Sequence, residues 1–196
     1  NQGNPGILPP QSTPNDKAYG EWSGAWWQWA YSFPMANNPV SDPTGALGTL
    51  GQSGPVWFLA GTFGTVAERS LTVPAGKALF FPIINTIWVN LPELGDNPWS
   101  EEQRAYARTV IAPFIDDAYN LSCQIDGVAV KNLVAYRCPT PDGAEYMVTL
   151  PADNPFAGYG LPAGTYGPCV DDGIYLMLAP LKPGQHTIHF SAESWW

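Results

Sequence analysis

The two histidines, His186 and His189, are the side chains of this sequence that ordinarily titrate near neutral pH and could serve as a general base. They lie three residues apart in a run with strand character, and alternation along a strand places them on opposite faces. Side chains on opposite faces cannot share a metal ion, and a histidine on a regular strand is more often structural. We therefore expect no histidine metal site.

Acidic pairs could supply the two carboxyl groups of a glycosidase, which must face each other across a substrate. The three pairs are Glu101/Glu102, Asp116/Asp117 and Asp171/Asp172. Neighbours in sequence do not meet that geometry, and helix capping and an exposed helix end explain the first two pairs. Asp171 and Asp172 precede Gly173 on a predicted turn, where carboxylates could bind Ca²⁺, although turns themselves favour Asp and Gly. We predict no metal or cofactor, with this Asp pair as the remaining Ca²⁺ candidate.

Four tryptophans fall close together, at Trp22, Trp26, Trp27 and Trp29. Apolar residues here recur at steps of three and four from position 19 until Pro34, which predicts a helix over residues ~17–33. Trp22, Trp26 and Trp29 share one face, which indicates burial against a sheet. Trp27 lies roughly 100° away around the helix, so we expect it either to be exposed or to fill a flanking groove. If it is exposed, it is available for stacking on a sugar or polymer.

Three further tryptophans, Trp99, Trp195 and Trp196, lie in loop or end positions where no apolar stripe demands burial. They are predicted ligand contacts together with Trp27. Closure of an open sheet end or an assembly contact would explain them equally well.

Composition narrows the class of protein. The 196 residues include only 13% charged residues and have a net charge of −9. This charge disfavours nucleic acid and anionic membranes as partners, and no apolar run approaches the ~18 residues of a membrane span. A weakly charged surface and an opening that resembles a mature chain after signal removal predict a secreted or cell-surface protein, extracellular or periplasmic. In that setting Cys123, Cys138 and Cys169 predict one disulfide, whose pairing stays open.

The elements that position these residues follow from the pattern along the chain. Residues 1–15 hold four prolines and are predicted to form a flexible arm, and residues 16–196 one β-rich domain. Ser100 with acidic residues after it begins a second helix over ~100–119. Short β-rich runs are predicted at 56–62, 65–73, 78–89, 122–130, 133–137, 145–150, 174–179 and 185–193. Asp126-Gly127 is a hairpin signal. We predict a mainly β fold, a β-sandwich or jelly-roll-like domain with two packed helices.

Several stretches resemble a loosely defined group of exported bacterial proteins of unassigned function. They are residues 21–29, 54–61, 74–82, 172–175 and 180–190, and include the motifs Trp-Trp-Gln-Trp and Pro-Ala-Gly-Lys-Ala-Leu-Phe-Phe-Pro. The resemblance implies export and a β-rich fold, and it assigns no activity and no catalytic residues.

These observations predict a secreted, non-catalytic binding module for a glycan or other extracellular polymer. One alternative is a structural subunit that self-associates outside the cell. A second alternative is a hydrolase with an unrecognised site at Asp171, Asp172 and His186, which requires the three side chains to converge on one pocket.

Overall fold

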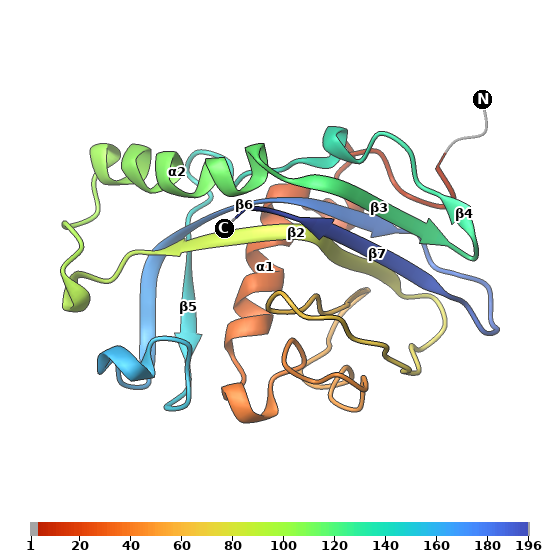
Figure 1. The fold of residues 1–196 in the computed structure, drawn as a ribbon, viewed down its shortest axis with the longest axis horizontal. Helices are drawn as coiled ribbons and strands as arrows, with labels where there is room; N and C mark the ends of the chain where they lie inside the picture. The colour runs from red at the N-terminus through yellow and green to blue at the C-terminus, as the bar shows by residue number, and fades with distance from the viewer. Residues whose placement is uncertain (1–3, 196) are drawn as a thin grey trace.

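The computed structural model describes residues 4–195, which form two helices, two sheets and short 3₁₀ helices (Figure 1). The helices are α1 (Tyr19–Tyr31) and α2 (Glu101–Asp116). The strands are β1 (Val56–Phe58), β2 (Ala78–Val89), β3 (Tyr119–Ile125), β4 (Val128–Ala129), β5 (Tyr146–Leu150), β6 (Gly164–Leu178) and β7 (Ile188–Glu193). One sheet has the order β1-β2-β6-β5 and the other the order β4-β3-β7.

The long antiparallel pair of β2 and β6 forms the centre of the four-stranded sheet, with α1 on one face and α2 on the other (Figure 1). On the α1 side, the ring of Phe80 stacks on Tyr175 with 5.2 Å between ring centres. The next residue, Phe81, faces the other way and contacts Phe190 of β7 at 5.1 Å. Alternation along β2 therefore supplies both layers of the core, and the smaller sheet packs on the same face as α2.

Both predicted helices are confirmed, and residues 78–89 form β2 as predicted. Asp126 and Gly127, both at positive φ, make the predicted hairpin turn between β3 and β4. Two predicted strands are wrong. Residues 133–137 give a 3₁₀ helix, Leu133–Tyr136, whose two buried side chains are three residues apart, the period of that helix. Residues 65–73 form no strand. This segment is instead held against neighbouring loops by Arg69, which donates hydrogen bonds to the backbone carbonyls of residues 40, 42, 60 and 61.

The predicted turn at Asp171-Asp172-Gly173 is also wrong, because all three residues lie inside β6, which begins at Gly164 rather than near residue 174. Gly173 serves close packing here. A Cβ at this position would come within 2.5 Å of the Tyr175 ring and 2.8 Å of the Ile84 carbonyl oxygen. Glycine in a strand thus marks a close approach between neighbouring strands.

The fold agrees with the coarser prediction of β-rich sheets with two packed helices. β1 runs parallel to β2 while β6 and β5 are antiparallel, so the larger sheet is mixed. This topology does not establish a sandwich or a jelly roll, which are built from antiparallel strands.

The described part of the predicted flexible arm, residues 4–15, is held against the sheet. Ile7 is buried and pairs with Leu178 at the end of β6, and Leu8 N donates to the carbonyl of Met177. An apolar residue among the prolines explains why this stretch docks.

The predicted disulfide is absent, since Cys123, Cys138 and Cys169 are all free thiols. Cys123 lies in β3 of the smaller sheet and Cys169 in β6 of the larger one. Cys138 follows the 3₁₀ helix, and its backbone N–H donates to the carbonyl of Gly173. Cys123 and Cys169 are buried and behave as small apolar side chains of the core.

Candidate functional site

Helix α1 buries all four of its tryptophans. Trp22, Trp26 and Trp29 are buried as predicted, and each indole N–H donates to a backbone carbonyl. Of the two expectations for Trp27, exposure is wrong, because only 6% of its surface is accessible, and the ring instead fills a groove on the flank of α1. Its ring packs edge-on against Trp26 and Tyr31, each at 5.1 Å between ring centres. Tyr31 in turn meets Phe156 of the segment between β5 and β6, so that segment covers the flank of α1 expected to face solvent.

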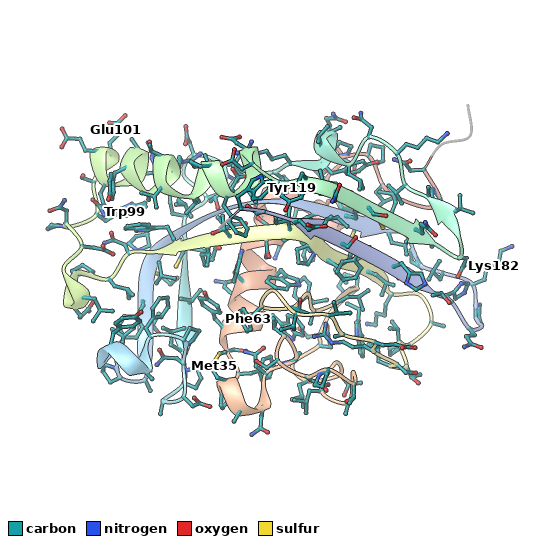
Figure 2. All side chains as sticks on the ribbon, in the orientation of Figure 1. Met35, Phe63, Trp99, Glu101, Tyr119 and Lys182 are labelled. Atoms are coloured by element: carbon teal, nitrogen blue, oxygen red, sulfur yellow. The ribbon has the colours of Figure 1, made fainter. Side chains whose placement is uncertain are left out.

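The other tryptophan candidates lie in different settings. Trp99 is partly buried beside the first turn of α2, near Glu101 (Figure 2), where it packs against a small cluster of Ala107, Ile111 and Val170. Trp195 is 80% exposed and stacks on Tyr119 at 4.9 Å. Trp196 lies outside the described residues. Exposure therefore fits the predicted contact role for Trp195 alone among the three described tryptophans.

Asp171 lies at the centre of a buried polar network on the α1 face of the sheet. Its carboxyl group accepts hydrogen bonds from Thr140 at 2.6 Å and from Tyr146 and Tyr175 at 3.2 Å. Asn85 donates to the Tyr175 hydroxyl. Burial raises the pKa of the Asp171 carboxyl to about 6, although the hydroxyl donors oppose the rise. The structure thus places a carboxyl group that titrates near neutrality where solvent does not reach it.

Asp172 points to the opposite face of the same strand. Arg137 donates to both of its carboxylate oxygens, at 3.1 Å from Nε and 2.6 Å from Nη2. Arg137 also pairs with Asp116 and reaches the Ala112 carbonyl of α2. A bidentate pair of this kind fixes the orientation of both partners.

His186 lies on the loop before β7 and does not join these aspartates. Its Nδ1 is 2.7 Å from Asp126 Oδ2, and its Nε2 is 2.8 Å from the Lys182 carbonyl oxygen. The hydrogen bond with Asp126 raises the pKa of the imidazole, and the Lys182 carbonyl adds to the rise. Because both ring nitrogens are occupied, the histidine clamps the loop and has no free nitrogen to act as a base.

These placements remove the physical basis of the predicted hydrolase site. Asp171 and Asp172 face opposite sides of a sheet, and His186 is bound to other partners on a loop. No substrate can be within hydrogen-bond reach of all three side chains.

Helix α2 carries a cavity on each flank. The first, which we call the arginine pocket, has a volume of about 320 Å³ and lies between α2 and the segment 137–140 beside β6. It is lined by Arg108, Ile111, Ala112, Arg137, Pro139, Asp171 and Asp172. Since the Asp171 carboxyl binds its partners on the other face, Asp172 supplies the carboxylate on this side.

The second cavity, which we call the tyrosine pocket, has a volume of about 400 Å³ and lies at the start of α2. It is lined by Asn97, Ser100, Glu102, Gln103 and Tyr106. Ser100 Oγ accepts from the Gln103 N–H and caps the helix, as the sequence predicted. Gln103 Nε2 donates to the buried Asn90, which holds the wall of the pocket in place.

Tyr106 forms the aromatic side of the tyrosine pocket. Tyr106 is 56% exposed, and its ring packs edge-on against Trp88, with 5.7 Å between ring centres. Trp88 and Trp99 both pack against the buried cluster under α2. The exposed Tyr106 ring therefore rests on Trp88, whose position is fixed by this packing.

Sequence reasoning missed both pockets. Arg104 and Arg108 are four residues apart and so share one flank of a helix, and Tyr106 falls outside the buried stripe of α2. This spacing indicates that the two arginines and Tyr106 lie on different flanks of α2. The residues that complete each pocket come from distant segments of the chain, which the spacing does not predict.

Within residues 4–195, neither helix combines the length and apolarity that a bilayer crossing requires. In the same residues, no group of three or more His, Cys, Asp or Glu side chains is arranged to hold a metal ion. Comparisons with protein-family models, with curated proteins and with solved structures find no match to this chain.

Proposed function

We propose that this protein is a secreted or cell-surface binding module for a glycan or a similar hydroxyl-rich polymer, and that the tyrosine pocket is its contact site. The observation that carries the proposal is an exposed aromatic ring, Tyr106, beside an amide, a hydroxyl and a carboxylate in one cavity of about 400 Å³. Ligand pockets of this size combine apolar surface with a few oriented polar groups.

The chemistry of the lining matches that of a sugar. A sugar ring offers an apolar C–H face to an aromatic ring and hydroxyl groups that both donate and accept hydrogen bonds. Tyr106 supplies rigid amphipathic area at low entropic cost. The Asn97 amide donates and accepts, the Glu102 carboxylate accepts, and the Ser100 hydroxyl has a proton left to donate after capping the helix.

The walls of the pocket are fixed before any ligand arrives. The helix cap at Ser100 and the hydrogen bond from Gln103 to the buried Asn90 hold the first turn of α2, and Trp88 supports Tyr106 from below. Preorganisation of this kind lowers the entropic cost of binding. The separation of Asp171, Asp172 and His186 supports binding over hydrolysis.

The test is a glycan array followed by calorimetry with any glycan that responds. Tyr106→Ala should abolish binding, because it removes the stacking surface. Val110→Ala is the matched control, since Val110 is also exposed on α2 but does not line the pocket. An array without any response, or equal loss of binding in both variants, would contradict the proposal.

Self-association is the second candidate function, and the exposed stack of Trp195 on Tyr119 favours it. A large exposed indole is a frequent anchor of protein interfaces. Light scattering over a concentration series should then show oligomers that Trp195→Ser dissolves. A protein that stays monomeric throughout the series would rule this function out.

A further inference from the structure

The arginines of this acidic protein are concentrated at one place. Of the four arginines in the sequence, Arg108 and Arg137 line the arginine pocket, and Arg104 lies 3.9 Å from Asp142, the carboxylate that Arg108 also binds. Two come from one flank of α2 and the third from the segment beside β6. In a chain with a net charge of −9, three arginines this close together are a distinct feature, and each of them is paired with a carboxylate.

Arg104 and Arg137 are each paired with a carboxylate that is largely shielded from water. Arg104 binds Glu145 at 3.1 Å, and the Glu145 side chain is 15% exposed. Arg137 binds Asp172, whose side chain is 5% exposed. Such partners are part of the folded structure, and a ligand would not displace them.

Arg108 is different. Its carboxylate partner is Asp142, whose side chain is 78% exposed and lies on the turn before β5. Its Nη2 also donates to the Thr140 carbonyl at 2.6 Å. Arg108 Nε is buried and has no hydrogen-bond partner among residues 4–195. A buried hydrogen-bond donor without a partner costs free energy, so the folded protein is destabilised by the unpaired Arg108 Nε.

We infer that a carboxylate-bearing ligand binds at Arg108 with its body in the arginine pocket, and that Asp142, which does not itself line the pocket, occupies the carboxylate position when no ligand is bound. Asp142 Oδ1 lies between two guanidinium groups, 3.0 Å from Arg108 Nη2 and 3.9 Å from Arg104 Nη1. A ligand carboxylate at this position meets the same two guanidinium groups. Arginine is well suited to such two-point recognition of a carboxylate.

The exchange is physically reasonable because an exposed ion pair contributes little stability. Asp142 returns to water at small cost when a ligand displaces it. Ile111, Ala112 and Pro139 give the pocket an apolar wall for the body of the ligand, and Asp172 offers an acceptor for a hydroxyl group. These features fit a uronic acid or a comparable small carboxylic acid. The site lies on the opposite flank of α2 from the tyrosine pocket and does not depend on the proposed function.

The test compares glucuronate, glucose and acetate by calorimetry at constant ionic strength. Glucuronate should bind at least tenfold more tightly than glucose, the effect of one charge-assisted contact, worth about 1.4 kcal/mol. Arg108→Gln should remove this preference. Asp142→Asn should strengthen binding, because it removes the internal competitor.

Lys182→Gln is the control for charge alone, since Lys182 lies at the far end of the molecule from Glu101 in the first turn of α2 (Figure 2). It should leave binding unchanged. Circular dichroism and thermal unfolding confirm that each variant is folded. If acetate binds as well as glucuronate, the pocket takes a free carboxylate; if glucuronate alone binds, it takes a sugar acid. Any one of three results would overturn the inference. The first is no preference for glucuronate over glucose together with no acetate binding. The second is an unchanged glucuronate affinity in Arg108→Gln, and the third is weaker binding in Asp142→Asn.

Discussion

The carboxyl groups of Asp171 and Asp172 are neighbours in β6 but lie on opposite faces of the sheet. Asp171 is enclosed by hydroxyl groups on the α1 side, and Asp172 is fixed by Arg137 on the α2 side. Alternation along a strand separates them, and each then acquires a different environment.

The buried Asp171 should make stability depend on pH. Its pKa rises from 3.8 to about 6 on folding, so the folded protein holds the proton more tightly than the unfolded chain. Stability from this group is therefore full below pH 4 and is lost as pH rises through 6, by roughly 3 kcal/mol at most. Urea unfolding at pH 4 to 7 should show this loss in the wild type relative to Asp171→Asn. Parallel curves for the two proteins would show that Asp171 does not titrate in this range.

Removing Arg137 should destabilise the fold strongly. Arg137→Ala leaves the shielded Asp172 carboxylate without its cation, a change that costs about 3–5 kcal/mol. The double variant with Asp172→Asn should recover part of the loss, because no buried charge then remains. Chemical denaturation of the two single variants and the double variant measures this coupling. Additive effects would mean that the pair does not interact.

Trp27→Ala should lower the free energy of unfolding by about 3–5 kcal/mol, as expected for a large ring removed from a core. The matched variant Trp195→Ala removes an indole that is 80% exposed and should change stability by less than about 0.5 kcal/mol. Equal and small effects in urea unfolding would place Trp27 at the surface after all.

The three cysteines should react as free thiols. A thiol assay in denaturant should find three per chain without a reductant. In the native protein Cys123 and Cys169 should react slowly, because burial raises the pKa of each thiol to about 12 and little thiolate is present. A single reactive thiol in denaturant would show that two cysteines form a disulfide.

Short sequence patterns predicted several elements of the fold correctly. The three- and four-residue spacing of Trp22, Trp26 and Trp29 located α1, and Ser100 with its acidic followers located the start of α2. The pair Asp126-Gly127 located a hairpin. Each of these features depends on a few neighbouring residues, so the sequence states them directly.

The same local signals misled where distant segments decided the outcome. Asp171, Asp172 and Gly173 have the composition of a turn, yet long β-strand pairing with β2 keeps them extended. Trp27 lies off the main stripe of α1, yet the segment that carries Phe156 covers it. Propensity is a weak guide when tertiary packing supplies the larger free energy.

The sequence by itself determined a weakly charged, acidic chain with two helices, several strands and a tryptophan face that enters the core. Only the tertiary structure decided which candidates could act together. It separated Asp171, Asp172 and His186, buried Trp27, and brought Arg108 of α2 beside Arg137 and the turn that carries Asp142. The physical reason is that periodicity shows which side of one element is apolar, whereas a site is formed by segments that meet only through long-range packing.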